Sequence, residues 1–368
     1  MSIRWRALDL PLLICLAILA ALGSATLYAA VHQGDMVLWQ RQNLHWLLGL
    51  GVFMLMCFLP LRFSALAAWP LYVIALVFLA LVPMIGEVQL GARRWLDLGL
   101  FHLQPSEMMK WALMLLMAHW FASREANQPR HLFTALAFAV VPAGLIFLQP
   151  DLGTTLVLLF ATTAMLLASG LPWRWFAYAT AAALLSAPLL WHNMHDYQRK
   201  RIVSFLDPQS DPLGAGYHVI QSTIAIGSGG IFGKGYLQGT QARLHFLPEQ
   251  HTDFIFGVMA EEGGLIVAML LLTLYAIMIY RILVIAARAH TRFASLICLG
   301  IASIFLIYIG VNIGMVSGLL PVVGVPLPFI SYGGSALVTM MAAMGMVMRV
   351  AIESENKVAW QRPGSPLL

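Results

Sequence analysis

Four ionisable residues stand where polar sequence gives way to long apolar stretches. Asp253 lies in FLPEQHTDFIF, Glu107 and Lys110 lie in QPSEMMK, and Asp151 lies in QPDLGT. An acid at the centre of a membrane helix costs roughly 2.5–3.5 kcal/mol on insertion scales, so a charge in such a setting indicates function. A carboxylate can act as a general base, and a lysine can stabilise a departing anion. These residue types therefore predict proton transfer on a substrate that carries negative charge.

The same acids also suit a structural role at helix starts. Proline precedes Glu107 and Asp151 by one or two positions, and proline is well placed at the beginning of a helix. An acid there can cap the helix and meet the positive end of its dipole. Glu107 and Lys110 are also spaced to pair with each other. For Asp151 alone the capping interpretation stays open, whereas three acids with Lys110 at one membrane face favour a site.

Basic residues beside the apolar stretches suit an anionic headgroup or a diphosphate. Arg199, Lys200 and Arg201 are consecutive in HDYQRKR, and a merely solvated basic run is the alternative. Glu261 and Glu262 are adjacent, so both cannot face one cavity. We expect one of them to point inward and the other to be satisfied by its neighbours.

Two motifs that could indicate other chemistry fail on inspection. In IGSGGIFGKGYLQG (226–239), Ser228 stands where a phosphate-binding loop needs glycine, and Gly235 follows Lys234 where serine or threonine is required. We expect a flexible loop with glycine hinges there instead of a nucleotide site. His251 near Asp253 lacks the spacing of a zinc site.

The elements that must position these residues are membrane helices. The chain has 368 residues, of which 60% are hydrophobic and 10% charged, which excludes an ordinary soluble domain. The apolar segments predict an all-α polytopic membrane protein, one domain over residues 1–368 with about ten transmembrane helices. Their expected ranges are 10–31, 44–60, 65–86, 106–122, 132–149, 151–170, 173–191, 253–280, 294–317 and 332–352. A large extracytoplasmic loop (192–252) separates the seventh from the eighth.

Two other outer stretches are too irregular to be simple connectors. Residues 91–110 alternate around Leu98 and Gly99, which predicts a short hairpin. Residues 317–335 contain three prolines and cannot form a continuous helix. Lysine and arginine are enriched in the loops that share a side with both termini, so both termini are expected in the cytoplasm. Most acids then lie on the outer side, where the chemistry is expected.

Several motifs together resemble the SEDS family (shape, elongation, division and sporulation) of bacterial envelope proteins. The resemblance covers residues 10 to 350 and rests on GARRWLDLG, QPSEMMK, QPDLGT, DPLGAGYHVIQSTIAIGSGG, FLPEQHTDFIF, AEEGG and PLPFISYGGS. HDYQRKR and NIGMVSGLLPVVGVPLP look like the RodA branch, which serves cell elongation. The chain departs from the pattern at Gly263, where relatives commonly have leucine, and we expect only a local packing change.

The resemblance implies a peptidoglycan glycosyltransferase at the outer face of the bacterial inner membrane. It would polymerise lipid II into glycan strands and release undecaprenyl diphosphate. It implies Asp253 as the catalytic residue, and substrate binding by Glu107, Lys110, Asp151, Arg201 and Arg94. It also implies a class B penicillin-binding protein as partner, with other membrane proteins of the elongation complex, membrane lipids and no nucleic acid.

Two rival functions stay open from the sequence. A lipid II flippase or transporter would also place charges in a membrane cavity, although transporter sites commonly lie near the midplane between repeats. A catalytically silent scaffold leaves the charges in apolar surroundings unexplained. No cofactor is certain, and Mg²⁺ or Mn²⁺ is a candidate because a departing diphosphate needs positive charge.

Overall fold

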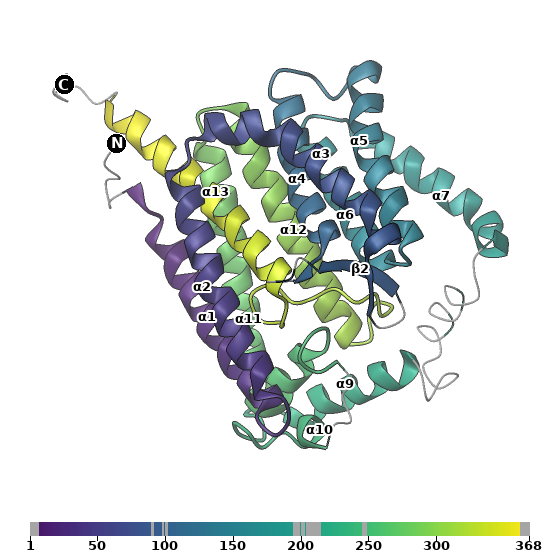
Figure 1. The fold of residues 1–368 in the computed structure, drawn as a ribbon, viewed down its shortest axis with the longest axis vertical. Coiled ribbons are helices and arrows are strands. Elements are labelled where there is room, and N and C mark those ends of the chain that lie inside the picture. The colour runs from purple at the N-terminus through teal and green to yellow at the C-terminus, as the bar shows by residue number, and fades with distance from the viewer. Residues whose placement is uncertain are drawn as a thin grey trace.

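The chain is described here from a computed structural model, which covers residues 7–89, 92–97, 99, 102–193, 199, 203, 215–244 and 249–360. Long helices occupy all ten predicted apolar segments (Figure 1). They are α1 (Leu10–Val31), α2 (Met36–Phe58), α3 (Leu61–Ile85), α4 (Pro105–Phe121), α5 (Pro129–Leu148), α6 (Leu152–Ala168), α7 (Arg174–Asn193), α11 (Ile255–Arg288), α12 (Arg292–Val316) and α13 (Gly334–Trp360).

Helix starts follow local side-chain chemistry. The carboxylates of Asp9 and Asp151 accept the backbone N–H groups of Leu12 and Thr154, each at 3.1 Å. Pro105 is the first residue of α4, where its missing N–H costs no intrahelical bond. These caps satisfy donors that would otherwise be left unpaired at the membrane edge.

Helix α2 begins earlier than expected, at Met36 and not at residue 44. The carboxylate of Asp35 caps it, because Val37 N–H donates to Asp35 Oδ1 at 3.1 Å. The polar residues that follow look unlike a membrane span, but they stay helical. Gln42 is buried and donates to the carbonyl of Ser331 at 3.2 Å, so tertiary contacts satisfy a polar side chain that the hydropathy pattern rejects.

Helix α12 holds the bundle together by packing against α4, α6 and α11, while α13 packs against α2. One continuous apolar core joins these helices. In the described part of the chain, six helices are long and apolar enough to cross a membrane: α1, α3, α5, α11, α12 and α13. Helix α9 (Ala215–Gly229) and helix α10 (Thr240–Arg243) lie within the large loop, toward the end of the bundle at which α12 ends (Figure 1).

A small antiparallel sheet departs from the expected all-α fold. Its strands are β1 (Glu87–Gln89), β2 (Ala92–Asp97) and β3 (His102–Leu103), in the order β1-β2-β3. The predicted hairpin around Leu98 and Gly99 is the β2–β3 connection, although Leu98 itself lies outside the described residues. Gly99 has φ 81°, and its N–H donates to Asp97 Oδ1 at 2.7 Å. The sheet packs on α3 and α4.

Helix α11 is interrupted at Gly264, whose φ of 65° and ψ of −165° are not helical. The carbonyls of residues 261–262 accept the N–H groups of residues 234–235 at 3.0 and 3.1 Å. The N–H groups of residues 265–266 donate to the carbonyls of residues 230–231 at 2.9 and 3.2 Å. A broken helix is tolerated in a membrane protein when other backbone satisfies its freed groups, and the glycine-rich segment does so here.

The glycines of this segment permit a close backbone crossing. A Cβ built on Gly233 would lie 2.0 Å from the carbonyl oxygen of Glu262, and one on Gly229 would lie 2.1 Å from that of Ala260. Gly233 also has φ +77°, which other residues rarely adopt. The expectation of glycine hinges in a flexible loop is therefore wrong for these positions, because contact with α11 requires the glycines.

Candidate functional site

The backbone around Asp253 is fixed from two directions. The carbonyls of residues 251–253 accept hydrogen bonds from Tyr332 N–H, Ser331 Oγ and Asn312 Nδ2 at 2.9, 2.6 and 2.9 Å. Three consecutive carbonyls are thus held by α12 and by the irregular segment before α13. The backbone that carries Asp253 is therefore fixed in position, and a fixed backbone is one requirement for a preorganised catalytic group.

Asp253 is not the cap of α11. The helix begins at Ile255, its N-cap residue is Phe254, and no side chain caps it. Asp253 is half-buried, and its carboxylate oxygen Oδ2 lies 3.3 Å from where a Cβ on Gly324 would stand. The structural alternative for this acid therefore loses its main support.

The segment between α12 and α13 brings the start of α6 close to Asp253. A Cβ on Gly153, in the first turn of α6, would lie 2.2 Å from the carbonyl oxygen of Val323. Gly324 adjoins the Asp253 carboxylate, and the carbonyl of residue 325 accepts Asn312 Nδ2 at 2.7 Å. Three successive residues of this segment thus contact α6, Asp253 and α12, so the segment links Asp253 to the first turn of α6.

Lys110 and Glu107 form a buried pair on α4. Lys110 Nζ lies 2.5 Å from Glu107 Oε1 and also donates to the hydroxyl of Tyr308. That hydroxyl in turn lies 2.9 Å from Glu107 Oε2. Lys110 is 1% exposed and Glu107 is 3% exposed, so a single lysine charge is compensated inside the protein. The possible pairing of the two residues is confirmed.

Asp151 is buried and caps α6, as its alternative interpretation stated. Arg94, on β2, donates from Nε to the carbonyl of Gln149 at 3.3 Å and from Nη2 to that of Pro150 at 2.5 Å. Arg94 thereby holds the chain just before Asp151. Arg201 and most of HDYQRKR lie outside the described residues.

Glu261 and Glu262 both accept hydrogen bonds from the chain between α9 and α11. Glu261 is fully buried, and its Oε1 accepts Lys234 Nζ at 2.6 Å and the N–H of Thr240 at 2.8 Å. Glu262 Oε1 accepts the N–H of Gly239 at 3.4 Å. Glu261 is thus satisfied by its neighbours, as expected for one of the two acids, and Glu262 has a backbone partner as well.

Tyr308 and Asn312 belong to the site although the sequence reasoning did not select them. They lie one turn apart on the same face of α12, about 6 Å along the helix axis. Tyr308 contacts the Lys110 pair, and Asn312 contacts the backbone of Asp253. The available signal was a tyrosine and an asparagine four positions apart in an otherwise apolar segment.

Two rings beside Asp253 have shifted pKa values. Burial lowers the pKa of His251, while Glu249 and Asp35 act in the opposite direction. Burial raises the pKa of Tyr332, which makes an edge contact with the His251 ring at a centroid distance of 6.0 Å. Both shifts favour neutral rings near neutral pH.

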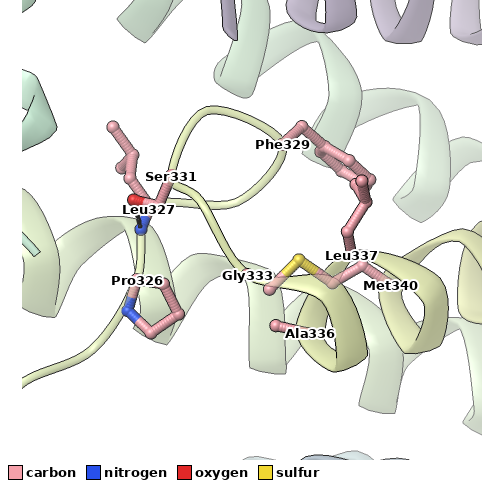
Figure 2. Close-up of a pocket in the computed structure, with 8 residues that line it drawn as sticks. All are labelled: Pro326, Leu327, Phe329, Ser331, Gly333, Ala336, Leu337 and Met340. Atoms are coloured by element: carbon pink, nitrogen blue, oxygen red, sulfur yellow. Dashed lines mark hydrogen bonds between the residues drawn. The ribbon is translucent and has the colours of Figure 1, made fainter. Parts of the chain in front are cut away.

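A small apolar pocket lies between residues 326–333 and the start of α13 (Figure 2). Its volume is about 10 Å³, enough for a single water molecule. Leu327 N–H donates to Ser331 Oγ at 2.7 Å beside it. The pocket therefore reflects the irregular backbone of this segment and is far too small for a sugar substrate.

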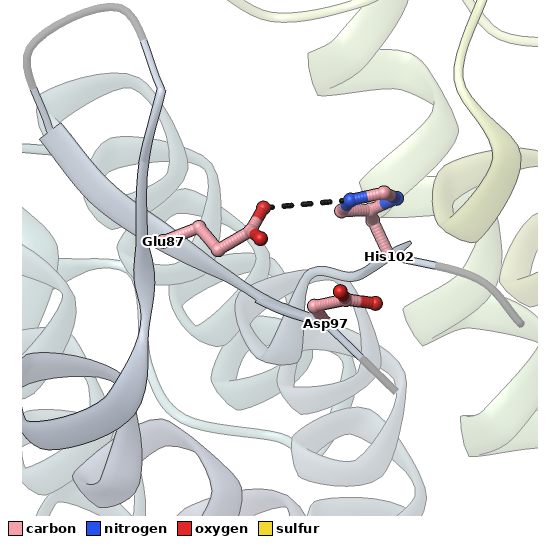
Figure 3. Close-up of side chains that lie close together, drawn as sticks. All are labelled: Glu87, Asp97 and His102. Atoms are coloured by element: carbon pink, nitrogen blue, oxygen red, sulfur yellow. Dashed lines mark ion pairs between the residues drawn. The ribbon is translucent and has the colours of Figure 1, made fainter. Parts of the chain in front are cut away.

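In the part of the chain that the structure describes, the side chains grouped closely enough to share a metal ion are Glu87, Asp97 and His102 (Figure 3). They lie on the small sheet. Asp253, Asp151 and Glu107 do not form such a group among the described residues. The group on the small sheet therefore contains none of the acids that the sequence selected as candidate site residues.

Comparison with known proteins agrees with the motifs. A family model described as cell cycle protein, of the FtsW, RodA and SpoVE proteins, matches residues 4–356. Peptidoglycan glycosyltransferase MrdB of Escherichia coli K12 is 46% identical over 346 residues, which cover 93% of each chain. Stage V sporulation protein E of Bacillus subtilis is 36% identical over 322 residues, covering 82% of this chain and 84% of the relative.

Solved structures show the same fold. A chain from a peptidoglycan synthase complex, solved to show how polymerization and crosslinking are coordinated, matches with TM-score 0.84 and 36% identity. The match covers 95% of this chain and 99% of the other. The rod shape determining protein RodA of Thermus thermophilus matches with TM-score 0.72 and 31% identity, covering 94% and 97%.

Proposed function

The chain belongs to the FtsW/RodA/SpoVE family of cell cycle proteins, and on that premise we propose how its residues carry out the reaction. It is a peptidoglycan glycosyltransferase of cell elongation and a multi-pass membrane protein. The relatives are named for glycan transfer, which favours a polymerase over a flippase or a silent scaffold.

Asp253 is proposed to act as the general base. The substrate is lipid II, and the reaction joins two lipid-linked disaccharides. The Asp253 carboxylate takes the proton of the acceptor sugar hydroxyl as that oxygen attacks the donor's anomeric carbon, and undecaprenyl diphosphate leaves. General base catalysis contributes roughly 10²–10⁴-fold. The fixed carbonyls of residues 251–253 support this assignment, because they hold the backbone that carries the carboxylate in one place before substrate arrives.

The other predicted residues complete the proposed site. Arg201 and Lys110 supply positive charge for the departing diphosphate, which needs cations more than a proton donor. Because Lys110 is buried against Glu107, a phosphate reaches it only by displacing that carboxylate. Asp151 and Arg94 shape the start of α6 beside the site. A divalent ion, Mg²⁺ or Mn²⁺, remains a proposed aid to the leaving group.

The membrane arrangement follows as a proposal. The chain forms one domain over residues 1–368 and crosses the bacterial inner membrane about ten times, with both termini in the cytoplasm. The large loop and Asp253 then face the outside. A class B penicillin-binding protein is the proposed partner, with other elongation-complex proteins around it. The matched peptidoglycan synthase complex, which coordinates polymerization with crosslinking, supports such an assembly.

The test uses purified Asp253→Asn protein with lipid II in detergent, where flipping has no second compartment and only polymerisation yields glycan chains. Asparagine keeps the size of aspartate but cannot accept the proton. We expect normal folding and nearly complete loss of chains. Glu125→Gln is the control, because Glu125 is an exposed acid that follows α4 at the end of that helix away from Glu107. Chains from Asp253→Asn at about a tenth of the normal rate or more would exclude the base role, given the size of such effects.

A further inference from the structure

Glu87, Asp97 and His102 occupy one face of the small sheet, each on a different strand. Asp97 on β2 is directly opposite His102 on β3. Glu87 on β1 is opposite Trp95, and Trp95 lies two residues before Asp97. Side chains two apart on a strand share a face, so the register gathers all three at one place. Figure 3 shows the carboxylate of Glu87 and the ring of His102 directed toward each other, with Asp97 beside them.

The spacing of these ligand atoms matches a metal's coordination shell. His102 Nε2 lies 3.4 Å from Glu87 Oε2. Two ligands about 2.1 Å from a tetrahedral ion are about 3.4 Å apart, because the angle between them is near 109°. The ligand atoms of all three residues lie within 4.8 Å of one another. Small rotations of exposed side chains would bring the third atom into the same shell.

The donor set indicates the class of ion. One imidazole with two carboxylates suits Zn²⁺ or another first-row transition metal, whereas Mg²⁺ and Ca²⁺ prefer oxygen ligands throughout. Three protein ligands leave positions for water. Arg93 is opposite Val88, beyond an irregularity in the β1–β2 register, and it donates to the carbonyl of Pro83 at 3.1 Å, so one of its donors is engaged away from the ligand atoms.

We propose that Glu87, Asp97 and His102 bind one divalent transition-metal ion, with Zn²⁺ as the best fit. The ion links all three strands. Strand β3 leads directly into α4, and His102 lies five positions before Glu107. Arg94 of β2 donates to the two backbone carbonyls that precede Asp151. The bound ion therefore stiffens the sheet that supports two helix starts of the site. The metal ligation rests on neither the activity nor the role of Asp253.

Binding is tested on the full-length protein in detergent after removal of any polyhistidine tag. The protein is stripped with EDTA, exchanged into chelator-free buffer and given Zn²⁺ or Mn²⁺ alone. Metal per chain is measured by mass spectrometry after gel filtration, and Mn²⁺ binding by loss of the free-ion electron paramagnetic resonance signal. The variants are His102→Ala and Glu87→Gln. The control is His131→Ala, which removes a half-buried histidine far from the sheet in sequence, whose Nδ1 lies 3.2 Å from a backbone carbonyl.

We expect about one tightly held ion per chain in the normal protein and in His131→Ala, as for a site with three protein ligands. His102→Ala and Glu87→Gln should each weaken binding by at least about tenfold, with an unchanged melting temperature in EDTA. Zn²⁺ should raise the melting temperature of the normal protein but not that of the two variants. Absence of stoichiometric binding in the normal protein overturns the proposal, and so does equal binding by His102→Ala.

Discussion

Removal of the Lys110 charge should destabilise the protein, and removal of both charges of the buried pair should restore it. Lys110→Met preserves length and apolar bulk but leaves the Glu107 carboxylate buried, with the Tyr308 hydroxyl as its one remaining side-chain donor among the described residues. Breaking a buried pair on one side costs about 3–5 kcal/mol. Glu107→Gln with Lys110→Met leaves no net charge, and neutral replacement of a buried pair is often tolerated.

The expected shift can be worked out from the size of the chain. At about 2.1 cal/mol/K of unfolding entropy per residue, a chain of 368 residues loses roughly 4–6 °C in melting temperature for 3–5 kcal/mol. The double variant should recover most of that loss. Lys110→Arg keeps the charge, yet it should also melt lower, because a larger guanidinium must fit where the lysine is 1% exposed.

Tryptophan fluorescence during heating measures stability, and lipid II polymerisation in detergent measures activity on the same samples. If Lys110 supplies charge to the leaving group, the double variant is stable and inactive. A double variant that melts as low as Lys110→Met refutes the charge-compensation argument. A stable double variant with normal activity removes Lys110 from the proposed site and leaves it a structural partner of Glu107.

Two further predictions concern the outer segments. Gly233→Ala should lower the melting temperature, because its Cβ would meet the Glu262 carbonyl oxygen at 2.0 Å. The control Gly144→Ala, in α5, meets nothing within 4 Å and should raise the free energy of unfolding by about 0.5–1 kcal/mol. Equal melting temperatures of the two variants would contradict the close backbone crossing. The pKa of His251 in the folded protein lies below its unfolded value of about 6.5. As the pH falls below that value, the unfolded state therefore binds the proton first, and the free energy of unfolding decreases until the folded ring is also protonated. His251→Gln should reduce this loss in melting scans between pH 7.5 and 5, and parallel curves for the two proteins would contradict it.

Periodicity and hydropathy were enough to place the helices, because long apolar runs leave few alternatives in a membrane. Hydropathy failed at the start of α2. The buried polar side chain of Gln42 is tolerated there because it donates a hydrogen bond to the carbonyl of Ser331. The break at Gly264 was also not predictable, because the sequence around it is apolar like the rest of the helix. The backbone that satisfies the break lies about thirty positions earlier in the chain. Such contacts depend on tertiary structure and leave no local signal.

The candidate site was predictable to a similar degree. The acids and Lys110 were identifiable because charge in apolar surroundings is costly. Tyr308 and Asn312 were not, since each is common enough in membrane helices as a packing or hydrogen-bonding residue. Their importance follows from facing α4 and the Asp253 segment, which only the packing of α12 determines. The sheet that holds Glu87, Asp97 and His102 depended on pairing between short strands whose register the sequence does not specify.

The interruption of α11 also explains how two adjacent acids can stand next to an apolar helix. Residues 265–280, up to the first arginine of the helix, extend about 24 Å at 1.5 Å per residue, which is less than a hydrocarbon thickness of about 30 Å. In the proposed membrane arrangement, the turn before Gly264 therefore lies close to the lipid. The glycine-rich segment crosses that turn at close range, and Glu261 is 0% exposed and Glu262 is 7% exposed. The break at Gly264 thus lets the protein's own backbone, and not lipid, surround both carboxylates.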